Sequence, residues 1–137
     1  MRTHRGEVSF PGGRLDPGET PVEAALREAH EEVALDPSHV EVIGELDHLA
    51  TMVSRSVIVP IVARLSGPPV VRAATSEVDR ILTVPLAELT RADTYREEHW
   101  GAGEETRSLY FFELDDETVW GATGRMLRQL LDLALSN

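Results

Sequence analysis

The sequence contains no cysteine and no lysine in 137 residues. Without cysteine the chain can form neither a disulfide nor a zinc–thiolate site, and it has no thiolate nucleophile. Without lysine it has no amine for Schiff-base chemistry, and all 13 basic side chains are arginine. Because disulfides are absent, a reducing compartment fits the chain, and we expect a cytoplasmic protein.

Long apolar runs and an excess of basic charge are also missing. No stretch approaches the roughly 18 consecutive apolar residues that span a bilayer, and the N-terminus has no apolar run typical of a secretory signal. The net charge of -11 disfavours binding to nucleic acid and to anionic membranes, because both are bound through basic side chains. We therefore expect no nucleic-acid or membrane partner, but a small diphosphate ligand is compatible when divalent cations neutralise the charge.

The length and the hydrophobic fraction of 42% predict a single domain over residues 1–137. Hydrophobic periodicity predicts helices over 21–33 and 123–135 and a helical turn over 85–89, whereas 91–107 is expected to be a loop. The strands predicted from alternating or continuous apolar patterns are 7–10, 40–46, 56–65, 80–84 and 108–114. Pro60 is expected to place 56–65 at a sheet edge or a bulge. Strands interspersed with two main helices predict an α+β, or mixed α/β, fold.

The segment 21–33 carries the clearest helix signals. Thr20 is suited to the N-cap, Pro21 to the first helical position and Glu23 to a capping box. On a helical wheel one arc is apolar and predicts the core-facing stripe. Its members are Val22, Ala25, Leu26, Ala29 and Val33.

Glu28, Glu31 and Glu32 occupy a second arc on the flank of the same helix. Each like-charge pair at this spacing costs about 0.2–0.5 kcal/mol in water. A solvated acidic face is the ordinary interpretation, and a site for hard divalent cations is the alternative, since such ions take several oxygen ligands. The spacing alone leaves both interpretations open.

The residues around this acidic cluster resemble the Nudix box of the Nudix hydrolase (MutT-like) family, over residues 13–35. The family pattern is Gly, five residues, Glu, seven residues, then Arg-Glu-apolar-any-Glu-Glu-any-Gly-apolar. Its defined positions are met here by Gly13, Glu19, Arg27, Glu28, Ala29, Glu31, Glu32 and Leu35. Ala34 stands where the family has Gly. The resemblance implies a Nudix-type α/β/α sandwich with a mixed sheet, and a hydrolase that cleaves diphosphate linkages with Mg²⁺ or Mn²⁺.

The resemblance also implies a role for each residue of the cluster. Glu31 and Glu32 would be metal ligands, Glu28 a further ligand or the general base, and the carbonyl of Gly12 an additional ligand. Arg27 and Glu19 would pair and hold the loop against the helix. Glycine at position 34 would favour a left-handed turn, so Ala34 implies either a right-handed turn or modest strain.

The run from His4 through Gly6 and Phe10-Pro11-Gly12-Gly13 resembles the coenzyme A pyrophosphatase branch of this family. This branch implies cleavage of coenzyme A to 4′-phosphopantetheine and adenosine 3′,5′-bisphosphate, with His4, Phe10 and Gly13 as substrate-binding candidates. Two alternatives remain: another nucleoside diphosphate-linked substrate, such as ADP-ribose or NADH, or a degenerate Nudix domain that binds a nucleotide without hydrolysing it. Intact Glu28, Glu31 and Glu32 argue against the last.

Members of this branch have a strand segment before the His, whereas Met1 stands only three residues before His4. We therefore expect an N-terminally truncated fold, in which an uncovered strand edge favours a homodimer or strand exchange. A further acidic metal ligand is expected from outside the box. The candidates are Glu97, Glu98, Glu104 and Glu105.

Overall fold

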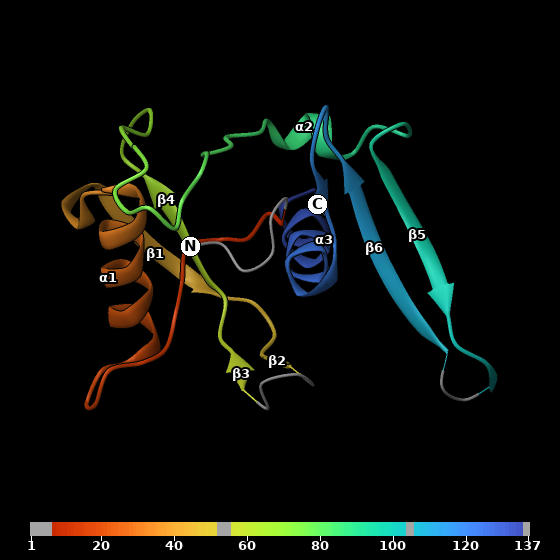
Figure 1. The fold of residues 1–137 in the computed structure, drawn as a ribbon, viewed down its shortest axis with the longest axis horizontal. Coiled ribbons are helices and arrows are strands. Elements are labelled where there is room, and N and C mark those ends of the chain that lie inside the picture. Colours follow the sequence, from red (N-terminus) through yellow and green to blue (C-terminus); the bar gives the residue numbers. More distant parts are fainter. Residues whose placement is uncertain (1–6, 52–55, 104–105, 136–137) are drawn as a thin grey trace. The chain divides into compact units, whose positions relative to one another are not determined.

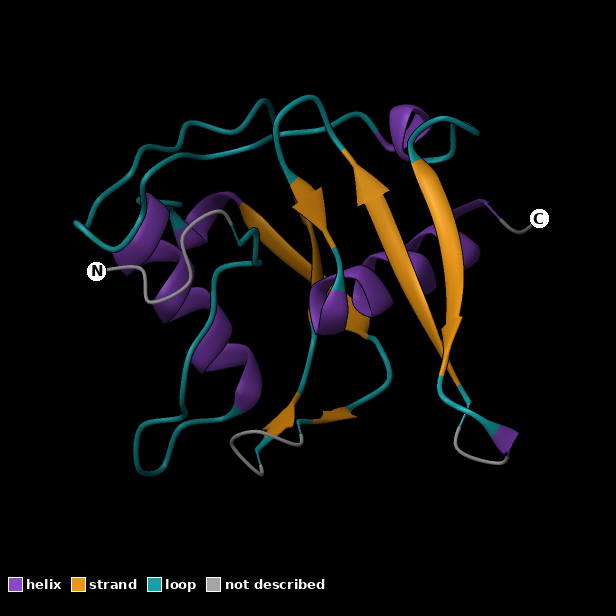
Figure 2. Ribbon diagram, turned by 45° about the vertical axis from the view of Figure 1, so that its right-hand side comes forward, coloured by secondary structure: helices purple, strands orange, loops and turns teal. Residues whose placement is uncertain are grey.

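The computed structural model describes residues 7–51, 56–103 and 106–135. Its backbone forms two compact units, one from residues 10–82 and one from residues 7–9 together with the chain after residue 82. Helices and antiparallel strand pairs occur in both units (Figures 1 and 2), which confirms the α+β prediction. No helix within the described ranges is long and apolar enough to cross a membrane.

The first unit combines one long helix with two short antiparallel strand pairs. Helix α1 (Pro21–Val33) is followed by a 3₁₀ turn, η1 (Pro37–His39), and by strand β1 (Val40–Glu45), which pairs with β4 (Ile61–Leu65). The second pair joins β2 (Leu49–Ala50) to β3 (Val57–Ile58). Helix α1 lies beside the β1–β4 pair, as Figure 1 shows.

Pro60 interrupts the strand that the sequence predicts over 56–65. Strand β3 ends at Ile58 and β4 begins at Ile61, so the chain leaves the ladder at Val59 and Pro60. The Pro60 carbonyl accepts a hydrogen bond from the backbone N–H of Leu46 at 3.0 Å. Proline has no backbone N–H to donate to a strand ladder, so the chain is irregular at Pro60, as predicted.

The second unit is a three-stranded antiparallel sheet with a helix on one face. Strands β5 (Tyr95–Trp100), β6 (Arg107–Glu113) and β7 (Thr118–Val119) pair in that order, and Glu7 makes an isolated parallel bridge to Thr118. Helix α3 (Gly121–Leu135) packs on β6, and the short helix α2 (Leu86–Leu89) contributes Leu89. The buried core comprises Leu89, Phe112, Val119, Leu127 and Leu131.

Gly124 allows α3 to approach the sheet closely. A Cβ at this position would collide with the carbonyl oxygen of Tyr110 and lie 3.6 Å from that of Val119. Because the colliding atom belongs to the backbone of β6, no side-chain rotation could relieve it. The absence of a side chain at Gly124 therefore sets the distance between α3 and β6.

Three local predictions are wrong. The chain forms β5 within the expected loop 91–107, it forms no strand over 80–84, and 7–10 contributes only the bridge at Glu7. Strand β5 is polar, with Tyr95 its one residue packed against the core. The strand forms because its six residues pair with six residues of β6, a pairing that its own polar composition does not predict.

Helix α1 ends in a left-handed residue. Ala34 has φ 60° and ψ 28°, its N–H donates to the His30 carbonyl at 3.0 Å, and the Leu35 N–H donates to the Ala29 carbonyl at 3.3 Å. These two hydrogen bonds close the helix in the manner usually associated with glycine. Of the two alternatives for position 34, the strained left-handed turn is the one adopted.

Replacing Ala34 by Gly is expected to stabilise the protein. The left-handed conformation costs a residue with a Cβ roughly 1–2 kcal/mol, and glycine's larger unfolded-state entropy offsets part of the gain, so Ala34→Gly should raise the free energy of unfolding by about 0.5–1 kcal/mol. Urea denaturation measures it. Ala29→Gly, inside α1, is the matched control and should lose about 1 kcal/mol. A loss of stability in Ala34→Gly would contradict the strain.

Candidate active site

The loop before α1 is held by the helix N-terminus and by its own turn. The Thr20 hydroxyl accepts from the Glu23 N–H at 3.1 Å, while the Glu23 carboxylate accepts from the Thr20 N–H at 2.8 Å, which is the predicted capping box. Gly18, with φ 81°, turns the chain, and the Asp16 N–H donates to Glu19 Oε1 at 2.8 Å. Glu19 thus closes its own turn and points at α1.

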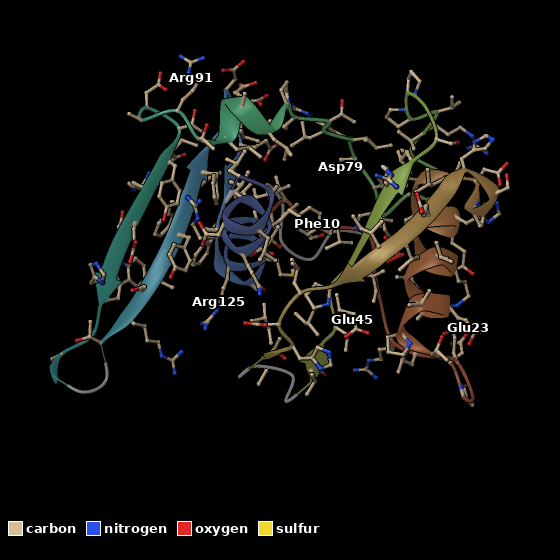
Figure 3. The ribbon with its side chains drawn as sticks, turned by 180° about the vertical axis from the view of Figure 1, so that it is seen from behind. Phe10, Glu23, Glu45, Asp79, Arg91 and Arg125 are labelled. Atoms are coloured by element: carbon tan, nitrogen blue, oxygen red, sulfur yellow. The ribbon has the colours of Figure 1, made fainter. Side chains whose placement is uncertain are left out.

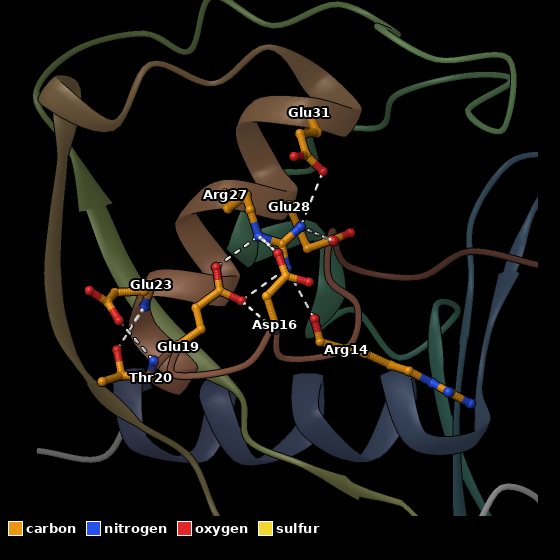
Figure 4. A network of polar contacts seen from close by, with 8 residues as sticks. All are labelled: Arg14, Asp16, Glu19, Thr20, Glu23, Arg27, Glu28 and Glu31. Atoms are coloured by element: carbon orange, nitrogen blue, oxygen red, sulfur yellow. Dashed lines mark hydrogen bonds and ion pairs between the residues drawn. The ribbon is translucent and has the colours of Figure 1, made fainter.

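Arg27 joins this loop to the acidic flank of α1 (Figure 4). Its Nε and Nη2 donate to the two carboxylate oxygens of Glu19 at 2.7 and 3.0 Å, and Nη2 also reaches the Arg14 carbonyl at 3.0 Å. Its Nη1 donates to Glu28 at 2.7 Å and to Glu31 at 3.2 Å. The guanidinium therefore makes the pair with Glu19 that the sequence predicts, and it also contacts Glu28 and Glu31 on the helix and Asp16 in the loop, the last at 3.3 Å.

The Arg27 hydrogen bonds also shift the pKa values of Glu19 and of Arg27 itself. They hold the pKa of Glu19 below its usual value, helped by the Asp16 N–H, and the hydrogen bonds that Arg27 donates to Glu19 and Glu28 raise the pKa of Arg27. Both groups remain ionised across the physiological range. The Arg27–Glu19 pair therefore stays charged near neutral pH.

The flank that bears Glu28 is partly covered, which argues against an ordinary solvated acidic face. The Glu28 side chain is only 17% exposed, and Ala24, one helical turn earlier, is the most buried residue of α1 at 4%. Glu31 is 54% exposed. The apolar stripe expected to face the core is only half-buried.

Gly13 leaves the space in which the Glu28 carboxylate lies. A Cβ on Gly13 would come within 2.7 Å of the Glu28 Cδ and Oε2 atoms, whereas a Cβ on Gly12 would have nothing within 4 Å. The two neighbouring glycines therefore differ in what they do. Gly13 accommodates a carboxylate, and Gly12 presents its backbone.

The Gly12 N–H donates to Glu32 Oε1 at 3.2 Å. Burial raises the pKa of the Glu32 carboxyl to about 7, and the neighbouring Glu28 and Glu77 add to the increase, whereas the Gly12 hydrogen bond opposes it. The Glu28 side chain is therefore close enough to Glu32 to disfavour the charged form of the Glu32 carboxyl. Sequence reasoning did not identify Glu77.

The residues of the cluster fit a hard divalent cation, although their side chains do not converge on one. Among the described residues, no three acidic or imidazole side chains form a ready metal site, because Arg27 holds Glu28 and Glu31. The donors are nevertheless carboxylate oxygens, which Mg²⁺ and Mn²⁺ prefer. Gly13 leaves a cradle that a side chain would fill. The individual ligand assignments stay predictions.

The other candidate residues are distributed as follows. Phe10, labelled in Figure 3, is 48% exposed, whereas His4 lies outside the described residues. In β5 of the second unit, Glu98 accepts from Arg96 and from the Trp100 indole, and Glu97 lies 3.6 Å from His99. Glu104 and Glu105 also lie outside the described residues.

A cavity of about 240 Å³ in the first unit is separate from this cluster. It is lined by residues that follow α1 and by the turn after β4, among them Leu35, Asp36, His39, Ser66 and Val70. None of the residues described for the cluster lines it. We therefore base no functional assignment on this cavity.

Comparison with known proteins agrees with the motif. The family model described as the NUDIX domain matches residues 1–106. The chain is 33% identical over 159 residues to Nudix hydrolase 3 of Caenorhabditis elegans, covering 97% of the chain and 62% of that protein. It is 35% identical over 131 residues to "Uncharacterized Nudix hydrolase NudL" of an Escherichia coli strain, covering 95% of the chain and 68% of that protein.

Gly13→Ala is expected to displace the Glu28 carboxylate. The colliding atoms are the far end of a flexible side chain, so the thermal unfolding midpoint should change little while the carboxylate moves. Affinity for Mn²⁺, measured by titration calorimetry, should fall about tenfold or more, as it does when groups that orient metal ligands are lost. Gly67→Ala, at a glycine outside the cluster where a Cβ would meet nothing within 4 Å, is the matched control and should retain the affinity. Equal affinities in the two variants would contradict the role of the cradle.

The raised pKa of Glu32 predicts a pH-dependent stability of the metal-free protein. Its folded-state pKa of about 7 lies above the unfolded-state value near 4.5, so the native state binds the extra proton between them. The Glu32 contribution is complete below about pH 4.5 and is lost as the pH rises through 7. Wild type should therefore lose stability relative to Glu32→Gln between pH 5 and pH 8, measured by urea denaturation with a chelator present. Parallel pH profiles for the two proteins would contradict this.

Proposed function

This chain belongs to the Nudix family, and from that premise we propose that it is a pyrophosphohydrolase that requires Mg²⁺ or Mn²⁺ and cleaves the diphosphate linkage of coenzyme A or its derivatives. The observation that carries the proposal is that the glycine loop at the start of the motif contacts the carboxylates of α1 near its end. Glu28 and Glu32 lie side by side against Gly13 and Gly12, and Arg27 ties the preceding loop to the same helix.

The reaction adds one water across the diphosphate. The water oxygen bonds to one phosphorus, the bond from that phosphorus to the bridging oxygen breaks, the bridging oxygen leaves with the second phosphate, and a carboxylate accepts a proton from the water. When bound, a divalent cation would neutralise charge on the phosphate oxygens and lower the pKa of a water molecule. We propose Glu31 and Glu32, with the Gly12 carbonyl, as its ligands and Glu28 as a further ligand or the general base.

Arg27 and Glu19 act on the reaction through position. Their bidentate pair fixes the loop that carries Gly12 and Gly13 relative to the carboxylates of α1. Catalysis of this kind depends on the placement of charges, because a misplacement of about 1 Å costs as much as 100-fold in rate. We therefore assign both residues to the catalytic machinery as positioning residues.

Coenzyme A is proposed because of the run that leads into the motif. Phe10 is half-exposed in this run, with Pro11 between it and Gly12, and is available to a ligand. Together with His4 and Gly13 it would contact the substrate. The products would be 4′-phosphopantetheine and adenosine 3′,5′-bisphosphate.

A hydrolysis screen tests the proposal. Purified protein with Mg²⁺ or Mn²⁺ is assayed against coenzyme A, ADP-ribose, NADH and diadenosine polyphosphates, with products identified by mass spectrometry. We expect turnover of coenzyme A above that of the others, and Glu32→Gln should reduce it at least about 100-fold. Glu41→Gln, which removes an exposed carboxylate paired with Arg64 on the β1–β4 pair, is the matched control and should retain wild-type turnover.

The outcomes separate the two levels of the proposal. Preference for ADP-ribose or NADH would exclude coenzyme A as the substrate and leave the hydrolase intact. No turnover of any compound by wild-type protein would exclude the hydrolase, and binding of the same nucleotides without turnover would then indicate the degenerate alternative.

A further inference from the structure

The sheet of the second unit carries a row of aromatic side chains on the face that α3 does not cover. Phe112 is buried in the core under α3, so the alternation of side chains along a strand places Phe111 on the other face. The rings of Phe111 and Trp120 are stacked with their centroids 6.0 Å apart, and the Trp100 ring lies 6.2 Å from that of Phe111. The row therefore crosses the sheet from β5 to the residue after β7.

Trp100 is an exposed side chain whose orientation is fixed. It is 52% exposed, yet its indole Nε1 donates a hydrogen bond to Glu98 Oε1 at 2.8 Å. Arg96 donates to the other oxygen of Glu98 at 2.7 Å and also pairs with Glu113. The Arg96 guanidinium in turn lies over the Phe111 ring, 4.5 Å from its centroid. Because ordering a side chain costs free energy on binding, a ring that is already held by hydrogen bonds is suited to stack with a ligand.

Arg107 adds a positive charge beside this ring. It lies directly opposite Trp100 in the register of β5 and β6, so both side chains emerge on the same face, with Cβ atoms about 4.5–5.5 Å apart. Arg96, on the same face, is occupied by Glu98 and Glu113. Arg107 is exposed, and within the described ranges no carboxylate pairs with it. In a chain with a net charge of -11, this guanidinium is a local exception that is available to an anion.

An exposed indole next to an available guanidinium matches the chemistry of a nucleotide. A nucleobase stacks on an indole through its π face, and a phosphate accepts hydrogen bonds from the planar fork of an arginine. A nucleic-acid strand fits less well, because it brings a phosphate with every nucleotide, whereas Glu97 and Glu98 place negative charges on the same strand as Trp100. The charges of this face therefore favour a single nucleotide over a polymer.

We infer that this face of the second unit binds a mononucleotide, with the base stacked on Trp100 and the phosphate paired with Arg107. Phe111 and Trp120 complete the aromatic row against which the Trp100 ring packs. The inference goes beyond the proposed function, because this site requires neither the carboxylates of α1 nor a divalent cation. Failure of the one therefore leaves the other standing.

Binding of AMP in the presence of a chelator tests the inference without hydrolysis. Titration calorimetry on the full chain compares AMP with adenosine, which lacks the phosphate. Trp100→Leu should lower the affinity for both compounds about tenfold or more, because stacking is lost. Arg107→Gln should lower the affinity for AMP about three- to fivefold and leave that for adenosine unchanged. Arg125→Gln is the matched control, since Arg125 (labelled in Figure 3) is exposed on α3, and it should retain both affinities.

Thermal unfolding midpoints establish that each variant is folded, and Trp100→Phe, which keeps a ring, should retain most of the affinity for AMP. Absence of AMP binding in wild type, or an unchanged affinity in Trp100→Leu, would overturn the inference. Tighter binding of an adenylate oligonucleotide than of AMP would overturn it in favour of a nucleic-acid strand. A dimer in sedimentation that Trp100→Leu dissociates, without AMP binding in wild type, would overturn it in favour of a second copy of the chain.

Discussion

The bidentate hydrogen bond between Arg27 and Glu19 is the interaction on which the rest of the site depends. It is made by two residues eight positions apart, one on α1 and one in the loop before it, and its geometry matches the planar guanidinium to both oxygens of the carboxylate. Lysine would hold such a loop less specifically, because its ammonium is a point charge. The same guanidinium also contacts Glu28 and Glu31. Its positive charge therefore holds the loop and reduces the repulsion between carboxylates along the helix.

The negative charge of the acidic flank is only partly compensated, and the uncompensated part lies at Glu32. Glu32 accepts a hydrogen bond from the Gly12 N–H, and its pKa is raised to about 7, first by burial and then by the charges of Glu28 and Glu77. A stable solvated face would have spread these carboxylates into water. Instead the backbone holds them together, through the loop of Gly12 and Gly13 on one side and the loop of Ala74 on the other. This flank therefore differs from an ordinary solvated acidic face, as the 17% exposure of the Glu28 side chain also indicates.

Local sequence chemistry predicted α1 and its surroundings with residue-level accuracy. The capping residues Thr20 and Glu23 and the helix 21–33 occur as predicted, because each depends on residues within one or two turns. Position 34 shows the limit of the pattern: the left-handed turn is kept although alanine replaces glycine. Strand β5 was missed because its polar residues become a strand only through pairing with β6.

The sequence by itself determined the chemical identity of the site: the capped helix, the spacing of Glu28, Glu31 and Glu32 along it, and the arginine and glutamate that join loop to helix. These features follow from helical periodicity and short-range hydrogen bonds, which a linear pattern encodes. Only the tertiary structure decided that Gly13 makes room for Glu28, that Gly12 contacts Glu32 across twenty positions, and that the loop of Ala74 bonds to the last turn of α1. Such proximity depends on how distant segments pack and on which backbone groups remain unpaired, and no local pattern records either.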